Sequence, residues 1–223
     1  MTTLDYAKAR ELMVEQQVRP WEVLDPRVLE VLSTLPREQF APAAHRNLAY
    51  ADVALPLGHG ESMMKPVVEG RSLQALDLAP GDDVLEIGTG SGFLTACLAR
   101  LAREVVSLEI HPDLADAARR QLAAQAIGNA RVETVDAFAF DTDRRFSAIC
   151  VTGAVTDIPQ QFLRWLQPGG RMFVVRGRSP AMEAVLLQAG ADGDAVNGAR
   201  IASLFETDLP YLVGAAPAPT FEF

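Results

Sequence analysis

Three alternating glycines directly follow a short apolar run in this chain. Residues 84–87 read Val-Leu-Glu-Ile and lead into residues 88–92, Gly-Thr-Gly-Ser-Gly. Glycine permits a tight turn from strand to helix and lets a ligand approach the backbone closely. Dinucleotide sites instead use Gly-x-Gly-x-x-Gly, in which a helix N-terminus receives a pyrophosphate. The spacing found here therefore favours an adenosine ligand that carries no phosphates.

Acidic residues stand at the ends of this predicted strand and of the next two. Glu86 lies two residues before Gly88, where a carboxylate suits the ammonium group of a methionyl moiety. Glu109 ends the second strand and can accept hydrogen bonds from both hydroxyls of a ribose. Asp136 follows the third strand and can accept from the exocyclic amino group of adenine. Open parallel sheets bind ligands at the carboxyl ends of their strands, so the three acids predict a nucleoside-type cofactor there.

Each of these features has an ordinary structural explanation when taken alone. A glycine-rich turn can be a plain connector, and a single Glu109 or Asp136 can be a helix cap or a solvated charge. Their common order along the chain favours a binding site. The predicted cofactor-binding residues are Glu86, Gly88, Thr89, Gly90, Gly92, Glu109, Ile110, Asp136 and Ala137.

The elements that would position these residues alternate between helix-like and strand-like patterns from residue 67 onward. Such alternation is typical of a mostly parallel sheet wrapped by helices. It predicts a Rossmann-like α/β fold with a seven-stranded, mostly parallel sheet, helices on both faces and an N-terminal helical extension. We expect helices at 67–76, 92–101, 112–125 and 158–166, strands at 83–87, 104–108, 131–135, 148–152 and 171–175, and one helix with two final strands within 182–223.

The N-terminal third has a different pattern. Apolar residues at helical spacing predict a helix over 5–18 that ends before Pro20, because a residue preceding proline avoids the α conformation. Asp25 and Pro26 predict the cap and first position of a second helix, which Pro36 ends. Residues 37–66 are expected to form loops with at most short strands. We therefore expect one domain, in which residues 1–66 supply helices and acceptor-side loops and residues 67–223 form the cofactor-binding core.

Composition limits the partners and the location. The chain has 223 residues with 20 Lys plus Arg against 29 Asp plus Glu, and its net charge of -9 disfavours nucleic acid as a partner. Cys97 and Cys150 lie in apolar stretches without metal-ligand spacing, as expected for buried thiols in a reducing compartment. A signal peptide and a long apolar run are both missing from the sequence, which predicts a cytoplasmic protein without a membrane partner, either monomeric or homodimeric.

Separated motifs resemble the protein-L-isoaspartate (D-aspartate) O-methyltransferase family over residues 13–177. They are Leu-Pro-Leu-Gly-His-Gly at 55–60, the block at 84–92 and Leu-Gln-Pro-Gly-Gly-Arg at 166–171, with further matches at 28–29, 36–42 and 49–52. The resemblance implies a methyltransferase that uses S-adenosylmethionine and methylates a carboxylate of a damaged protein or peptide. It also implies that Glu86, Gly88, Gly90, Glu109 and Asp136 bind the cofactor.

The segment expected to hold the methyl acceptor departs from the family pattern. Family members usually carry Gly-Gln-Thr-apolar-Ser-Gln-Pro, whose serine helps to hold the acceptor carboxylate, whereas residues 60–66 here read Gly-Glu-Ser-Met-Met-Lys-Pro. Met64 therefore replaces the serine, while Ser62 and Lys65 supply a nearby hydroxyl and a cation that could pair with an anion. Residues 69–71, Glu-Gly-Arg, also replace small apolar residues. Ser62, Met64 and Lys65 are our candidate acceptor-positioning residues.

Methyl transfer needs little chemical apparatus from the protein. A carboxylate acceptor, with a pKa of about 4, is ionised at neutral pH and needs no general base, and no metal is required. His45, His59 and His111 are scattered, and only His59 lies in the loop before the glycine motif. Four alternatives remain: an isoaspartyl-type carboxyl methyltransferase, a methyltransferase of the same fold with a small-molecule acceptor, a cofactor-binding protein without catalysis, and an NAD-dependent oxidoreductase, which the glycine spacing disfavours.

Overall fold

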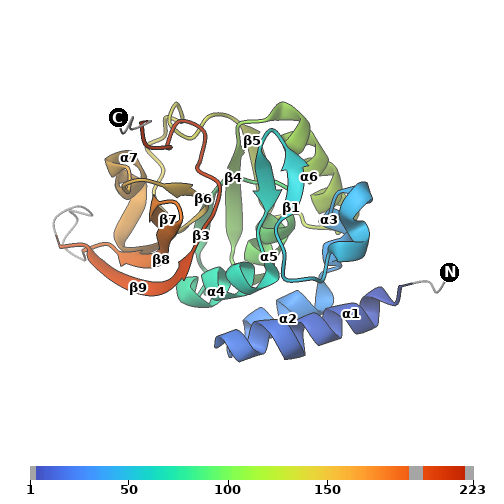
Figure 1. The fold of residues 1–223 in the computed structure, drawn as a ribbon. Helices are drawn as coiled ribbons and strands as arrows, with labels where there is room; N and C mark the ends of the chain where they lie inside the picture. The colour runs from blue at the N-terminus through green and yellow to red at the C-terminus, as the bar shows by residue number, and fades with distance from the viewer. Residues whose placement is uncertain (1–3, 191–197, 219–223) are drawn as a thin grey trace, which may run out of the picture.

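A seven-stranded sheet forms the centre of the computed structural model, which describes residues 4–190 and 198–218 (Figure 1). The strands lie in the order β5-β4-β3-β6-β7-β8-β9, parallel from β5 to β7 and antiparallel for the last two. Their bounds are β3 Asp83–Ile87, β4 Glu104–Glu109, β5 Ala130–Thr134, β6 Phe146–Val155, β7 Leu166–Arg178, β8 Ala181–Gln188 and β9 Arg200–Thr207. The predicted Rossmann-like fold with a mostly parallel seven-stranded sheet is therefore confirmed.

Helices cover both faces of this sheet. Strand β3 is buried along its whole length, because Val84 packs on the side of helices α4, α5 and α6 while Leu85 and Ile87 pack on the other side. There Phe162 of helix α7 and Trp165 complete the second apolar layer. The bounds of these helices are α4 Pro66–Leu76, α5 Phe93–Leu101, α6 Pro112–Ala124 and α7 Gln160–Arg164. A strand buried on both faces explains the continuous apolar run that precedes the glycines.

The N-terminal segment packs against α4 and α5 (Figure 1). Helix α1 spans Tyr6–Met13 and continues as a wider π-helical turn over Val14–Val18, and α2 spans Pro26–Thr34. As predicted, the Asp25 side chain caps α2, accepting a 2.8 Å hydrogen bond from the Arg27 backbone N–H. The predicted loop region also contains the short helix α3, Arg37–Phe40, a 3₁₀ helix over Ala43–Leu48 and an antiparallel hairpin of β1, Leu55–Gly58, and β2, Glu61–Met63.

Two predictions for the second half of the chain need correction. The described residues after 181 hold the two expected strands but no helix, and residues 191–197 and 219–223 lie outside the described part. Residues 181–188 form β8 because they pair antiparallel with β7 along their whole length. The predicted helix at 158–166 is shorter than expected, because Leu166 already belongs to β7.

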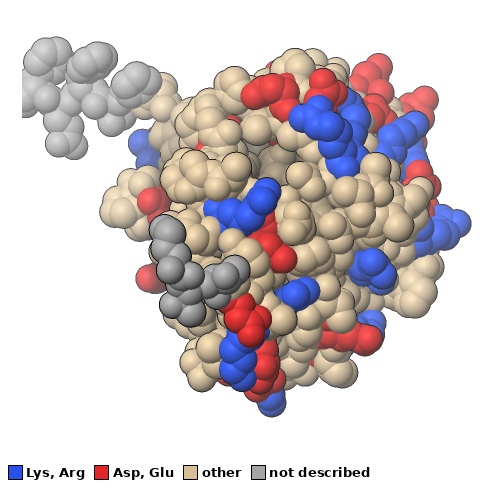
Figure 2. All heavy atoms as spheres, turned by 90° about the vertical axis from the view of Figure 1, so that its right-hand side faces the viewer, with Lys and Arg blue, Asp and Glu red and all other residues tan. Residues whose placement is uncertain are grey.

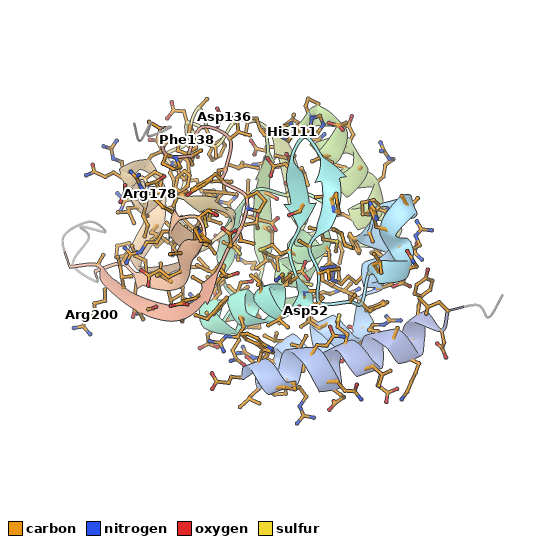
Figure 3. The ribbon with its side chains drawn as sticks, in the orientation of Figure 1. Asp52, His111, Asp136, Phe138, Arg178 and Arg200 are labelled. Carbon is orange, nitrogen blue, oxygen red and sulfur yellow. The ribbon has the colours of Figure 1, made fainter. Side chains whose placement is uncertain are left out.

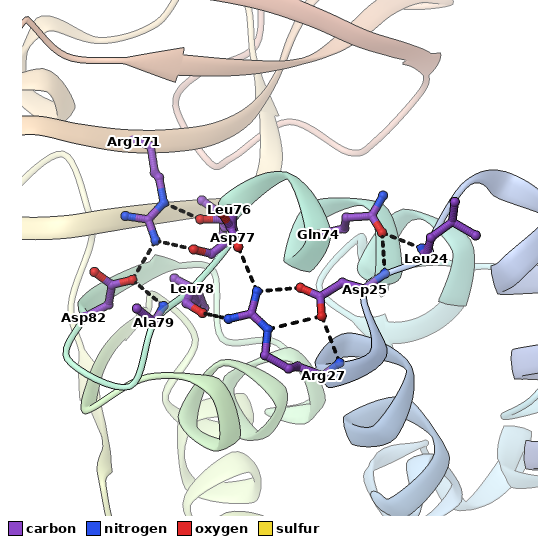
Figure 4. A network of polar contacts seen from close by, with 10 residues as sticks. All are labelled: Leu24, Asp25, Arg27, Gln74, Leu76, Asp77, Leu78, Ala79, Asp82 and Arg171. Carbon is purple, nitrogen blue, oxygen red and sulfur yellow. Dashed lines mark hydrogen bonds and ion pairs between the residues drawn. The ribbon is translucent and has the colours of Figure 1, made fainter.

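A network of arginines fastens the N-terminal helices to the sheet (Figure 4). Arg27 of α2 donates to Asp25, to Asp77 after α4 and to the Leu78 carbonyl. Arg171 of β7 donates to the Asp77 carbonyl at 2.8 Å and to Asp82 Oδ2 at 2.6 Å. This network fixes the end of α4 relative to β7, and with it the helix that borders the site described below.

The surface carries charges of both signs. On the face that Figure 2 shows, basic and acidic side chains are interspersed and do not form a large patch of one sign. None of the helices in residues 4–190 and 198–218 combines the length and the apolar character needed to cross a membrane.

Candidate active site

A cleft with about 880 Å³ of empty space, part of it open to solvent, lies at the carboxyl ends of the central strands. In Figure 3, His111, Asp136 and Phe138 mark this edge of the molecule. The carboxyl-terminal parts of four neighbouring strands and the segments that follow them line one side. The β1–β2 hairpin and the start of α4 line the other side. The sheet-side residues are Ile87–Ser91, Leu108–Ile110, Val135–Phe138, Thr152 and Gly153, and the opposite side includes Leu57, Glu61–Met64 and Glu69.

The glycine loop is held by hydrogen bonds from both neighbouring strands. The backbone N–H groups of Gly88 and Thr89 donate to the Leu108 carbonyl of β4 at 2.9 and 3.1 Å. On the other side, Thr152 Oγ1 of β6 donates to the carbonyls of Ile87 and Gly88 at 3.0 and 2.6 Å. Gly88 has a φ of 96°, and a Cβ there would lie 2.3 Å from Thr152 Oγ1. The loop therefore requires glycine at this position, and its backbone forms the floor of the cleft.

Gly92, the last of the predicted cofactor-binding glycines, lies beside the cleft at the start of helix α5. It does not line the cleft but caps helix α5, where a Cβ would come within 3.0 Å of Ala118 Cβ on α6. The third glycine of the motif thus allows α5 and α6 to pack closely.

Glu109 and Asp136 lie in the cleft as predicted, each at the end of its strand. Glu109 accepts hydrogen bonds from the backbone N–H groups of Gly90 at 2.7 Å and His111 at 3.0 Å. Asp136 Oδ1 accepts from the Phe138 backbone N–H at 2.8 Å. A carboxylate offers about four acceptor sites, so both side chains keep capacity for a ligand. Ile110 and Ala137 line the cleft beside them.

Glu86 is not part of the cleft lining. Its side chain is fully buried, and one oxygen, Oε2, accepts from Thr95 Oγ1 and Ser107 Oγ, each at 2.5 Å. Ser107 Oγ lies 2.6 Å from Thr89 Oγ1, which connects Glu86 to the glycine loop from beneath. Burial raises the pKa of Glu86 to about 8. The direct contact with a methionyl ammonium that the sequence predicted for Glu86 therefore has no support in this geometry.

On the acceptor side, the structure brings two of the three candidate residues into the cleft. Ser62 and Met64 line it together with Met63. Lys65 is exposed and lies outside the lining, because it is the N-cap residue of α4 and precedes the buried first turn of that helix. The proposed pairing of Lys65 with an anionic acceptor is thus not supported by its position.

A buried ion pair borders the cleft beside Met64. Arg37 is fully buried, and its Nη2 lies 3.3 Å from Glu69 Oε2 and donates to the Met64 carbonyl at 2.5 Å. The same guanidinium lies over the Phe93 ring, 5.1 Å from its centroid. Burial raises the pKa of Glu69 to about 7, although the nearby Arg37 opposes this shift. In the sequence Glu69 stands out only as a departure from the family pattern, since its charge gives no signal of burial.

Two stacked imidazoles hold the β1–β2 hairpin against α6. The rings of His59 and His111 lie 4.1 Å apart with an 8° angle between their planes. His59 Nε2 is 3.0 Å from both oxygens of Asp113, and His111 Nε2 is 3.7 Å from Glu61 Oε1. The hairpin that carries Ser62 and Met63 is therefore fastened next to Glu109.

The last wall comes from a segment after β9 that the sequence analysis did not identify. Residues 209–213 contribute Leu209, Pro210, Leu212 and Val213 to the lining. Ala154 of β6 donates to the Pro210 carbonyl at 2.8 Å and accepts from the Leu212 N–H at 2.9 Å. The Tyr211 hydroxyl also donates to the Gly177 carbonyl at 3.0 Å, and Leu212 packs on Gly153. The segment shows no regular apolar spacing in the sequence, so local pattern does not predict this wall.

Comparison with known proteins assigns the family. The sequence profile of protein-L-isoaspartate (D-aspartate) O-methyltransferase matches residues 8–202. The chain belongs to this family. Protein-L-isoaspartate O-methyltransferase 1 of Syntrophobacter fumaroxidans is 37% identical over 191 residues, 85% of this chain and 89% of that protein. The enzyme of a Synechococcus strain is 40% identical over 177 residues, 79% of this chain and 72% of that protein.

A solved structure shows the same fold. The putative protein-L-isoaspartate O-methyltransferase of Plasmodium falciparum, determined with S-adenosyl-L-homocysteine, aligns with a TM-score of 0.77 at 18% identity, covering 94% of this chain and 98% of its own. Family membership makes the chain a methyltransferase of the S-adenosylmethionine-dependent class. The predicted family, fold and cofactor class are thereby confirmed.

Proposed function

We propose that this O-methyltransferase transfers the methyl group of S-adenosylmethionine to the carboxylate of an isoaspartyl-type residue in a damaged protein or peptide. One observation carries the proposal: a single cleft joins the glycine loop, Glu109 and Asp136 to the hairpin that bears Ser62 and Met64. On this proposal residues 67–223 supply most of the cofactor side and residues 1–66 the acceptor-side loops, within one domain.

The cleft fits an adenosine cofactor part by part. Asp136 and Ala137 would hold the adenine, Glu109 and Ile110 the ribose, and the floor over Gly88, Thr89 and Gly90 the remainder. A Cβ at Gly88 would collide with Thr152, so the loop conformation that exposes this floor depends on glycine there. When bound, S-adenosylmethionine supplies an electrophilic methyl group attached to a sulfonium.

The chain's own residues then act by positioning and by excluding water. The buried side chains of Met63 and Met64 give the acceptor end an apolar lining, which strengthens electrostatic interactions inside it. Ser62 Oγ is the side-chain hydroxyl on the hairpin that can donate to an acceptor carboxylate. An ionised carboxylate needs no proton removed, so correct placement supplies most of the rate gain.

The test is methylation of an isoaspartyl peptide, measured by transfer of radiolabelled methyl groups to a base-labile ester. We expect label in the isoaspartyl peptide and none in the same peptide with normal aspartate. Ser62→Ala should lower kcat/KM by about tenfold, the loss of roughly one hydrogen bond to a charged group. Lys65→Ala is the matched control and should be unchanged, since Lys65 lies outside the cleft. Equal labelling of both peptides would contradict the proposal.

A second candidate function is methylation of a different, small-molecule acceptor. Two features of the cleft lining favour this candidate. Among the described residues no Lys or Arg lines the cleft. Met64 also stands where the family pattern has serine. A carboxylate in that site would have neutral donors only. Under this alternative the protein would bind S-adenosylhomocysteine and methylate components of a small-molecule extract, while isoaspartyl peptides would receive no label.

A further inference from the structure

Glu69 is a buried carboxylate that borders the cleft with incomplete hydrogen bonding. The residue is 1% exposed, and its Oε2 accepts no hydrogen bond in the described structure. The nearest cation is Arg37 Nη2 at 3.3 Å, and that nitrogen already donates to the Met64 carbonyl. An ionised carboxylate in such a place needs a further donor, because burying a charge without full pairing is costly.

The direction of the cleft places Glu69 at one particular end. Asp136 follows β5 and Glu109 ends β4, so an adenosine held by these acids extends across β3 toward β6. Its amino-acid end then lies over the glycine loop and Thr152, where α4 and the hairpin face the sheet. Glu61, the other acid of that wall, lies at the ribose side, 3.7 Å from His111 Nε2. Glu69 is therefore the carboxylate available at the amino-acid end.

We propose that Glu69 binds the positively charged amino group at the methionyl end of the cofactor, the role that the sequence assigned to Glu86. The inference rests on the proposed cofactor binding and adds the residue that recognises the ammonium group. Glu86 also has one oxygen, Oε1, without a hydrogen bond, but it lies beneath the loop beside Thr95 and Ser107 and does not line the cleft. Glu69 reaches the cleft from α4. In the bound state Glu69 would lie between two cations, Arg37 and the ligand ammonium.

The surroundings of Glu69 give the binding a pH dependence. The charged and titratable groups around it are Arg37 on α3, Asp52 before β1, Cys97 on α5 and Glu86 on β3. Burial raises the pKa of Glu69 to about 7, so a fraction of the free protein carries a protonated Glu69 near neutrality. A cationic ligand favours the ionised form, so affinity should be constant above this pKa and fall as the pH drops below it.

Isothermal titration calorimetry with two ligands tests the inference. S-adenosylhomocysteine carries the amino-acid end, and 5′-methylthioadenosine lacks it while keeping adenine, ribose and sulfur. At about pH 8, Glu69→Gln should raise the Kd for S-adenosylhomocysteine by about tenfold or more and leave that for methylthioadenosine unchanged. Glu61→Gln is the matched control, a cleft acid at the ribose side that should not discriminate between the two ligands. Glu69→Asp, which keeps the charge, should recover part of the affinity.

The possible results distinguish a failure of the Glu69 inference from a failure of the proposed function. Equal weakening of both ligands by Glu69→Gln, with the fold intact by circular dichroism, would overturn the inference. So would unchanged binding of both ligands with a lower kcat/KM for acceptors that bear a free amine, since Glu69 would then recognise the acceptor. If wild-type protein binds neither ligand, the proposed cofactor binding itself fails. Loss of the pH dependence below about 7 in Glu69→Gln would support the inference independently.

Discussion

Substitution of Gly88 by alanine tests the geometry of the glycine loop most directly. The new Cβ would lie 2.3 Å from Thr152 Oγ1, and the backbone would keep a φ of 96°. The threonine would have to rotate away, giving up its hydrogen bonds to the carbonyls of Ile87 and Gly88. Both consequences destabilise the folded chain and also disturb the floor of the cleft.

The expected loss can be worked from these two consequences. A left-handed backbone costs a non-glycine residue about 1–2 kcal/mol. The lost hydroxyl donor adds about 0.5–1.5 kcal/mol, since that is the net worth of a typical hydrogen bond. Gly88→Ala should therefore lower the free energy of unfolding by about 1.5–3.5 kcal/mol.

Urea unfolding monitored by tryptophan fluorescence and circular dichroism measures this loss. Gly81→Ala is the matched control, because Gly81 has a negative or extended φ and open space around its Cβ position. The control should change stability by less than about 0.5 kcal/mol. In a Thr152→Ala background the collision is absent, so Gly88→Ala should cost only the backbone component. A cost that is the same in both backgrounds, or no larger than that of Gly81→Ala, would refute the reasoning.

Three further predictions concern buried and cleft-lining charges. Arg37→Leu should lower the free energy of unfolding in urea by about 3–5 kcal/mol, because it leaves Glu69 buried without its cation, and Arg37→Leu/Glu69→Leu should recover most of that loss. Burial raises the pKa of Glu86 from 4.5 to about 8, so the folded chain holds the protonated carboxyl more tightly than the unfolded chain does. This contribution to the free energy of unfolding is fully present below pH 4.5 and is lost as the pH rises through about 8. Glu86→Gln should thus show a smaller decline of unfolding free energy over that range. Asp136→Ala should raise the calorimetric Kd for S-adenosylhomocysteine by about tenfold, with loss of an acceptor at the adenine side.

The residues at the strand ends of the cleft could be predicted, because the position of each is set by the strand that directly precedes it in the sequence. Gly88, Glu109 and Asp136 lie at or just after the carboxyl ends of three consecutive parallel strands, and these ends meet at one edge of the sheet. Local spacing was sufficient for these positions. The same holds for Asp25 and Pro26, whose capping role is set within one turn of helix.

The face of the sheet toward which Glu86 points could not be predicted from local spacing. Strand β3 is buried on both faces, so its apolar pattern does not indicate which face meets the ligand. Glu86 shares its face with Val84, the face that α5 covers, and Thr95 of α5 donates to it. Glu69 takes the place at the cleft because α4 packs beside β6 and β7, a contact between distant segments that local spacing does not encode.

The helix expected somewhere within residues 182–223 is missing from the described part of that range. Residues 181–188 read Ala-Met-Glu-Ala-Val-Leu-Leu-Gln, a composition rich in helix formers. Pairing with β7 and β9 on both sides makes them a strand, since tertiary contacts override such weak preferences. The Leu209–Val213 wall depends on similar long-range contacts with Ala154.

The wall formed by Leu209 to Val213 also bears on how the protein is made. Synthesis proceeds from the N-terminus, so a nascent chain has all seven strands of its sheet before this wall leaves the ribosome. A ligand stabilises only the state that binds it, in proportion to the logarithm of its concentration over Kd. Until translation has passed residue 213 the cleft lacks this wall, so the contacts that the wall offers a ligand can add to stability only at the end of synthesis.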